Sequence, residues 1–456
     1  MTINILPDTV LLEIFDFYVN AFGTPEWKTL VHVCRNWRII VFDSPRRLDL
    51  RLFCRADTPV KEMLDVWPLL PIVVWGVDYA LTALEYNDRI CQIDLKYGIP
   101  SWKWEEVLEA MQKPFPVLRS LKLSPMHQVA PVDPDFLCGS APRLQTFELS
   151  NVPFLGLPNL LLSATHLVDL KLSIPHSGYI SPDAMLTGLS TLTRLKRLNI
   201  ELQDSRSRPD RNSQCPPPHA RAHLPALTKF WFEGVNDYLE DLVACIDTPL
   251  LNDLSVYFIH QLIFSSPQLI QFINRTPKLQ SHDHARVVLE PEEDVYVTIP
   301  QTSGGMLHLQ IKSPSDQFFS LAQFCTSSIP RALISAVGCL YIDEGAVLEH
   351  YDNIERNTIQ WLEFLRPYTA VKHIYIGWGL TPHLILTLQK IVEERVTEVL
   401  PTLQTVFLED YAENYPSFVP VQEAIGQLVA ARQLVGQPIA FSLWDGNPPD
   451  SYNYNF

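Results

Sequence analysis

The sequence lacks the short motifs that identify many enzymes and metal proteins. It contains no G-x-G-x-x-G, Walker-type loop, H-E-x-x-H or G-x-S-x-G pattern. Its eight cysteines are widely spread and include no C-x-x-C pair, which argues against a zinc ribbon or a thioredoxin-like site. A Ser/His/Asp triad leaves no fixed spacing in a sequence, because its members meet only in space. We therefore predict a protein that is not an enzyme and that carries no catalytic residue, no metal and no cofactor.

The sequence also has no excess of basic residues. It carries 35 lysines and arginines against 51 aspartates and glutamates, which gives a formal net charge of -16 at pH 7. A protein that binds nucleic acid mainly through phosphates needs basic side chains that release counterions, so we expect no nucleic-acid partner. A mildly basic protein partner suits this charge better.

Long apolar runs are missing as well. The longest uncharged stretch, residues 149–168, is about long enough to cross a membrane but contains Pro153, Pro158 and several polar residues. The N-terminus carries Asp8 and Glu13 where a secretory signal would be uncharged. Together with scattered thiols that suit a reducing compartment, these features predict a cytoplasmic or nuclear protein, or one present in both, without a membrane partner.

The composition nevertheless supports a folded chain. Apolar residues make up 47% and charged residues 19% of the sequence, so a sizeable core can form. A length of 456 residues allows three ordinary domains, or one small domain followed by an elongated array of repeats.

The first fifty residues contain two apolar helical patterns. Only Glu13 and Asp16 are polar in the stretch 10–18, so a helix here is apolar on nearly every side. A second helical pattern spans 24–41, starting at a favourable N-cap residue followed by proline. So small a domain usually needs support to stay folded. The surplus apolar surface must therefore be covered by the rest of the chain or by another protein.

A specific combination of residues occurs in this region. Leu6-Pro7 precede the first helix, Ile14-Phe15 lie within it, and Val-Cys-Arg-Asn-Trp-Arg follows at 33–38. Over residues 3–50 the chain resembles the F-box, which docks substrate receptors onto the Skp-type adaptor of a cullin-RING ubiquitin ligase. A longer insert at 20–27 departs from the compact form of the family. The resemblance implies adaptor contacts, some of them shared with the core, from Leu6, Pro7, Leu11, Ile14, Phe15, Val33, Cys34 and Trp37.

From about residue 90 onward one strand-like phrase recurs. It consists of an apolar residue, two variable residues, an apolar residue, one variable residue and an apolar residue. Clear copies begin at Ile90, Leu118, Leu144, Leu167, Leu195, Leu227, Leu251, Met306, Val337, Val371 and Leu403. Helical patterns occur at 104–112, 238–246, 268–275, 359–365, 384–400 and 419–435, and a last strand is expected at 439–443. Because one strand-helix unit cannot bury its own apolar face, such units stack side by side.

These patterns predict an α/β chain built from two parts. An N-terminal all-helical F-box-like module occupies 1–48, and an irregular leucine-rich-repeat-like solenoid, with a parallel sheet inside and helices outside, occupies 49–445. At the start of the solenoid we expect a strand at 48–52, a helix at 60–67 and a strand at 72–74.

Three segments interrupt the pattern. Residues 203–223 are polar and rich in proline and arginine, which predicts a mobile loop insertion. Within 282–305, His282 and His284 replace the apolar residues of the phrase, so we expect either a break or an inserted hairpin there. The tail 446–456 is predicted to be flexible.

The resemblance to F-box proteins, which are abundant in filamentous fungi, also implies a function. Such a protein is a substrate receptor that binds the adaptor, and through it cullin, with one part and a target protein with the other. It performs no bond chemistry but raises the effective concentration of the target near the ubiquitin-conjugating enzyme. We expect the variable positions on the inner face of the sheet to contact the target, including Lys122, Glu148, Lys171, Asn199 and Trp231.

Two other interpretations stay open. The chain can be an interaction scaffold that binds the adaptor without delivering substrates. Alternatively, it can be a metal-dependent enzyme built around His282 and His284, because alternate residues of a strand point the same way. Exposed aromatic residues often dominate protein interfaces, so Trp231, Tyr375 and Trp378 are further candidates for ligand contact.

Overall fold

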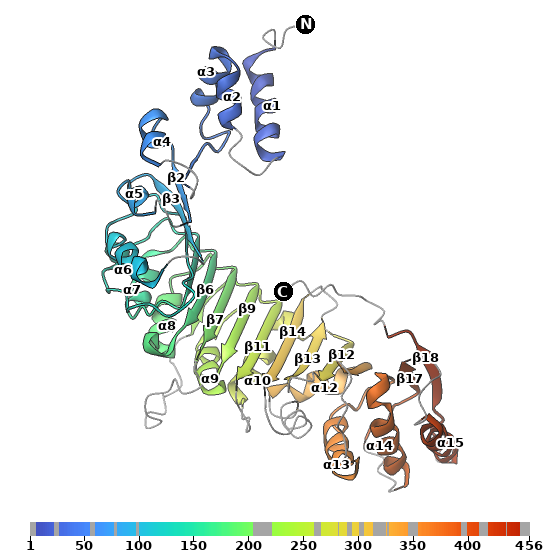
Figure 1. Ribbon diagram of the computed structural model, residues 1–456. Helices are drawn as coiled ribbons and strands as arrows, with labels where there is room; N and C mark the ends of the chain where they lie inside the picture. The colour runs from blue at the N-terminus through green and yellow to red at the C-terminus, as the bar shows by residue number, and fades with distance from the viewer. Residues whose placement is uncertain are drawn as a thin grey trace. The chain divides into compact units, whose positions relative to one another are not determined.

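The computed structural model shows an α/β protein whose strands pair mostly in parallel (Figure 1). The chain divides into two compact units, Met1–Leu195 and Lys196–Phe456, a boundary that the sequence patterns did not indicate. The described residues are 6–21, 27–54, 60–76, 80–96, 100–203, 221–259, 266–280, 282–289, 294–300, 305–312, 325, 328–344, 354–393, 399–409, 418–434 and 436–446. Among them, no helix combines the length and the apolar character needed to cross a membrane.

The chain begins with three helices, α1 (Asp8–Ala21), α2 (Trp27–Val33) and α3 (Arg35–Asp43). The Pro7 carbonyl accepts hydrogen bonds from the Val10 and Leu11 N–H groups in the first turn of α1, and Asp8 in the same turn interacts favourably with the helix dipole. The prediction of a single second helix over 24–41 was wrong. Cys34 has an extended backbone and caps α3, with its Sγ accepting a hydrogen bond from the Trp37 N–H at 3.5 Å. Residues 22–26, which include the expected cap Thr24, lie outside the described residues.

Aromatic packing joins these helices to the next segment of the first unit. The Phe15 and Trp37 rings lie 4.7 Å apart between α1 and α3. Trp67, directly after α4 (Val60–Val66), contacts the rings of Trp27 and Phe42 at 5.2 and 6.3 Å. Such tilted and edge-on aromatic contacts stabilise a small core beyond the area that they bury.

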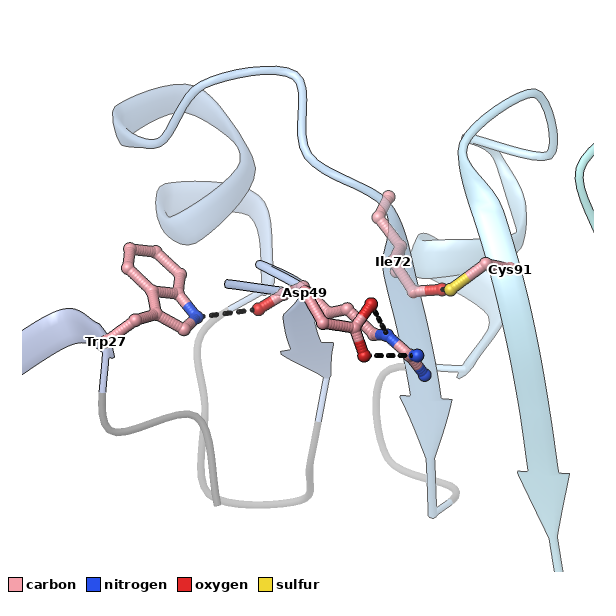
Figure 2. A network of polar contacts seen from close by, with 5 residues as sticks. Trp27, Asp49, Ile72 and Cys91 are labelled. Carbon is pink, nitrogen blue, oxygen red and sulfur yellow. Dashed lines mark hydrogen bonds and ion pairs between the residues drawn. The ribbon is translucent and has the colours of Figure 1, made fainter. Parts of the chain in front are cut away.

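Polar contacts mark the passage from the helices to the sheet (Figure 2). The Trp27 indole N–H donates to the Arg51 carbonyl at 3.1 Å, and the Arg51 guanidinium pairs with Asp49. The Cys91 thiol donates to the Ile72 carbonyl at 3.4 Å. The strand expected at 48–52 begins later than predicted, at Leu52. The residues before it form turns, with hydrogen bonds such as that from the Leu50 N–H to the Pro45 carbonyl at 2.9 Å.

The sheet of the first unit follows the chain order without interruption. Each strand pairs in parallel with the next, as the repeated phrase predicted. The strands are β1 (Leu52–Cys54), β2 (Ile72–Trp75), β3 (Ile90–Leu95), β4 (Ser120–Leu123), β5 (Thr146–Ser150) and β6 (Asp169–Ile174). Their connections contain α4, α5 (Ala80–Leu84), α6 (Ser101–Ala110) and α7 (Leu157–Ser163), and α8 (Pro182–Leu189) follows β6.

The sheet of the second unit contains one reversal. Its strand order is β7-β9-β11-β14-β13-β12-β15-β16-β17-β18, and β13 is antiparallel to both of its neighbours. The strands are β7 (Arg197–Leu202), β9 (Lys229–Gly234), β11 (Asp253–Ile259), β12 (His284–Leu289), β13 (Asp294–Pro300), β14 (Met306–Lys312), β15 (Cys339–Glu344), β16 (His373–Ile376), β17 (Thr405–Glu409) and β18 (Ala440–Trp444). The helices are α9 (Asn236–Ala244), α10 (Pro267–Arg275), α12 (Arg331–Ala336), α13 (Ile354–Leu365), α14 (Thr381–Glu393) and α15 (Phe418–Leu434).

The structure tests several of the predictions made for irregular segments and for one long helix. Of the two alternatives for 282–305, the inserted hairpin is confirmed by the antiparallel pairing of β13. The helix expected at 384–400 ends earlier, as α14, and 399–400 are not helical. Most of the loop expected at 203–223 lies outside the described residues, but β8 (Ala222–His223) pairs with β10 (Ile246–Asp247). The tail beyond residue 446 also lies outside them.

Alternation of burial along the strands explains both the register and the two faces of the sheet. In β11, Leu254, Val256 and Phe258 are buried, whereas the intervening residues are half-buried. Because successive side chains of a strand point to opposite faces, the buried set shares one face of the sheet and the half-buried set shares the other. A shift by one residue would expose every apolar side chain of a strand, which fixes the register.

Candidate functional site

The exposed side of α1 carries an apolar stripe. Val10, Ile14 and Phe17 have exposed fractions of 41%, 43% and 78%. At about 100° per residue, these three positions lie within about 60° of one another around the helix. Leu6, just before the helix, is also exposed. Grouped apolar exposure of this kind marks an interaction surface more often than scattered exposure does. We call these four residues the α1 stripe.

The other apolar side of α1 belongs to the core. Leu11 and Phe15 are fully buried, and Phe15 packs against Trp37. Both residues are among the predicted adaptor contacts, some of which were expected to be shared with the core, and their burial places them in that shared group. One apolar side of α1 therefore packs in the core, and the other apolar side, the α1 stripe, is exposed.

The remaining predicted adaptor contacts have mixed environments. Pro7, Ile14 and Val33 are exposed together with Leu6, whereas Cys34 and Trp37 are half-buried. Cys34 caps α3, and Trp37 supports Phe15, so both have structural roles.

Sequence reasoning missed three exposed apolar residues near these positions. Val10 and Phe17 complete the α1 stripe, and Ile39 of α3 is 48% exposed. The spacing 10, 14 and 17 is a helical i, i+4, i+7 pattern that the sequence displays. The signal was present, but a helix with apolar residues on nearly all sides does not reveal which side its own chain covers.

A charge cluster lies on the half-exposed face of the first sheet. Lys122, Glu148 and Lys171 are register partners on β4, β5 and β6, as expected for side chains that share a face. Glu148 lies 3.7 Å from the Lys122 ammonium, 3.6 Å from that of Lys171 and 3.8 Å from that of Lys96. The structure therefore brings together three of the five residues predicted to contact a target, and adds Lys96.

The second unit carries the other two predicted target contacts. Asn199 and Trp231 are register partners on β7 and β9, and the Trp231 ring lies 5.2 Å from that of Tyr257. The Tyr257 ring in turn lies 5.3 Å from the buried His308. Burial lowers the pKa of His308 to about 4, so its ring is neutral at pH 7.

A second aromatic group lies on the same face of strands β15 to β17. Tyr341, Tyr375 and Phe407 are register partners whose rings stack at 4.3 and 4.4 Å. We call these three residues the aromatic ladder. Trp444 of β18 packs edge-on against Tyr375 at 5.4 Å. Only Tyr375 was singled out from the sequence, because the partners of a strand residue depend on pairing between distant segments.

Trp378, the other aromatic candidate near the ladder, occupies a different kind of position. It begins a short 3-10 helix, Trp378–Leu380, and its backbone N–H donates to the Glu409 carboxylate at 3.1 Å. It therefore orients an acidic side chain through its backbone.

The two histidines of the metal interpretation do not share a strand face. β12 begins at His284, and His282 lies before the strand, separated from it by a bend at Asp283. The His282 Nε2 donates to the Leu333 carbonyl at 3.1 Å, and burial lowers the pKa of His282. Within the described part of the chain, no group of three or more potential ligands is placed to hold a metal ion.

Two buried thiols in the described part of the chain are not activated as nucleophiles. Burial raises the pKa of Cys54 to about 11 and that of Cys325 to about 12. Both thiols are protonated at pH 7, and the thiol is far less nucleophilic than the thiolate.

Comparison with known proteins assigns no family. Neither a protein-family model nor a curated protein sequence matches this chain. The arguments for function therefore come from the residues and their geometry.

Proposed function

We propose that the chain is the substrate-receptor subunit of a Skp-cullin-F-box type ubiquitin ligase. In this proposal α1 to α3 form an F-box-like module that binds the adaptor, and the repeated strand-helix units form a leucine-rich-repeat-like solenoid that holds a target protein. The observation that carries the proposal is the α1 stripe, which includes Leu6 of the Leu6-Pro7 element that resembles the F-box.

The stripe favours a partner because its own chain does not cover it. Leu11 and Phe15 already supply the contact of α1 with the core, so Val10, Ile14 and Phe17 are not needed for that contact. Burial of apolar side chains from water is the main favourable term in protein association. A second protein that packs against this side of α1 buries these side chains, which favours binding without disturbing the core.

The half-exposed face of each sheet supports the second part of the proposal. Parallel strands place the variable residues of neighbouring repeats side by side, as in the row Lys122, Glu148 and Lys171. Such a row offers charged and aromatic groups on a rigid support, which keeps the entropy cost of binding low. The receptor then acts by holding its target near the ubiquitin-conjugating enzyme.

A co-purification experiment tests the docking step. The full chain is expressed with a Skp-type adaptor, and Leu6→Ala/Pro7→Ala is compared with the unmodified chain. We expect the double variant to lose most of the adaptor while other bound proteins remain. Leu434→Gln is the matched control, because Leu434 is a 90% exposed leucine on α15. Equal recovery of the adaptor by all three proteins would contradict the proposed docking site.

A second experiment separates a receptor from a scaffold. If the chain delivers substrates, a protein bound to it accumulates when cullin activity is blocked. A bound protein whose level does not change under this block favours a scaffold that binds the adaptor without delivering substrates.

A further inference from the structure

The first unit covers the outer edge of its sheet with its own residues. The Leu52 N–H donates to the Pro71 carbonyl at 2.8 Å, so the peptide groups of Arg51, one residue earlier, point away from β2. The Arg51 carbonyl accepts the Trp27 indole N–H (Figure 2). Helix α2 therefore satisfies an edge acceptor that a foreign strand would otherwise use.

The outer edge of the second unit is formed by β18, and no described strand pairs with its free side (Figure 1). The Ala440 N–H donates to the Gln404 carbonyl, just before β17, at 2.8 Å. Successive residues of a strand turn their peptide groups to opposite sides, so those of Phe441 and Leu443 point away from β17. Two N–H and two C=O groups of β18 therefore line its free side.

Nothing within β18 blocks pairing with a further strand. Natural edge strands are protected by charges, prolines or bulges. β18 has none of these in its five residues, and its pairing with β17 is regular. Residues 433–444 carry no charge, although the whole chain has a net charge of -16. Leu443 is 61% exposed and Phe441 is half-buried, whereas their register partners Leu408 and Val406 are buried.

The bulky residue of β18 does not obstruct this edge. The Trp444 indole N–H donates to the Ile376 carbonyl at 3.4 Å, and its ring packs against Tyr375 at 5.4 Å. Both partners belong to β16, two strands in from the edge, so the indole is directed away from the free side. Ser442, in the middle of β18, is short and exposed.

One two-fold arrangement uses all of these groups. If a second β18 pairs antiparallel about an axis at Ser442, Phe441 of each copy faces Leu443 of the other. These residues then form hydrogen-bonded pairs, their apolar side chains share one face, and Ser442 meets its own copy in a non-hydrogen-bonded pair. Asp445 falls opposite Ile439, so no acid meets an acid. An axis at Phe441 or Leu443 would pair β18 partly with residues outside the strand.

We propose that β18 is a homodimer interface, at which two copies of this chain join their sheets antiparallel about a two-fold axis at Ser442. The uncharged run 433–444 lets two acidic chains approach here without like charges meeting. The two-fold pairing leaves no free edge at β18 on either copy, and the Trp27 contact opposes head-to-tail pairing of β18 with β1. Dimerisation at β18 is independent of the proposed adaptor and target contacts.

Sedimentation velocity of the full chain tests for the dimer. A single pair of strands is a small interface, so we expect a weak dimer whose fraction rises between about 1 and 100 µM. A chain that stays monomeric throughout this range would overturn the inference, because the edge would then be left open or covered by another segment.

Opposite charges at the axis test the register. Only a two-fold axis at Ser442 places this residue against its own copy, where like charges repel and opposite charges attract. We expect Ser442→Lys and Ser442→Glu each to dimerise about two- to fivefold more weakly than the unmodified chain. Fluorescently labelled Ser442→Lys mixed with unlabelled Ser442→Glu should form a dimer about two- to fivefold tighter than the unmodified one. A mixture that associates no better than either variant alone would overturn the inference.

The first unit supplies a matched control. Leu155 is 61% exposed, the same fraction as Leu443. Leu155→Lys and Leu155→Glu, alone or mixed, should dimerise like the unmodified chain. If the Ser442 variants unfold early in a thermal melt, Leu443→Lys at the exposed edge should weaken the dimer, and an unchanged dimer would contradict the interface. Ile14→Gln/Phe17→Gln should dimerise normally, so a failure of adaptor docking is distinguishable from a failure here.

Discussion

Replacing Ile14 and Phe17 of α1 with glutamine should weaken binding of a Skp-type adaptor while the chain stays folded. Both side chains are apolar and exposed, with 43% and 78% of their surfaces open to solvent. Glutamine is a good helix former, so α1 itself should persist. The change therefore acts on the proposed interface and not on the core.

The expected size follows from the exposed fractions. Complete burial of a large apolar side chain contributes about 1.5 to 3 kcal/mol. Scaled by the exposed fractions of Ile14 and Phe17, burial under a partner contributes about 2 to 3.5 kcal/mol. A loss of this size corresponds to an increase in Kd of about 30- to 300-fold.

Isothermal titration calorimetry of the purified chain with the purified adaptor measures this change. Leu434→Gln serves again as the control and should bind like the unmodified chain. Urea unfolding of the double variant should differ by less than about 0.5 kcal/mol, as expected for surface positions. If the double variant is well folded and its Kd is within about threefold of the original, the reasoning about the α1 stripe is wrong.

Three further predictions concern stability. Phe15→Ala should lower the free energy of unfolding by about 3 to 5 kcal/mol in urea, because it empties a fully buried ring position; a loss below about 1 kcal/mol would contradict the core assignment. The folded-state pKa of His308, about 4, lies below the ordinary value of 6.5, so the unfolded chain binds more protons between these values. Stability should be complete above pH 6.5 and fall toward pH 4, by on the order of 3 kcal/mol, and His308→Gln should flatten this pH dependence; an unchanged slope would refute it. Glu148→Gln should cost about 1 kcal/mol or less at low salt, because its lysine partners are partly exposed, and the cost should shrink at high salt; a loss independent of salt would argue against an electrostatic origin.

The strands were more predictable than their interruptions. Each copy of the repeated phrase became a strand because its apolar residues recur with the period of two that buries one face of a sheet, as Leu121 and Leu123 do in β4. The break between α2 and α3 was missed because the apolar spacing continues through Cys34. Only the extended backbone and the thiol cap of that residue reveal it.

The candidate sites were likewise predictable only in part. The row Lys122, Glu148 and Lys171 was predictable because equal positions of successive phrases become neighbours in a parallel sheet. The sequence did not predict that Leu11 and Phe15 are buried whereas Val10 and Phe17 are exposed. Hydrophobicity alone does not show which side of an apolar helix faces its own chain. The boundary after residue 195 also falls within a regular repeat and leaves no mark in the sequence.

The account depends most on the claim that the α1 stripe is open in the free chain and covered by the adaptor. Hydroxyl-radical footprinting with mass spectrometry measures the solvent exposure of individual side chains in both states. We expect Phe17 and Ile14 to be oxidised readily in the free chain and protected when the adaptor is added, with Leu434 unchanged. Protection of Phe17 already in the free chain, or no protection by the adaptor, would contradict the account.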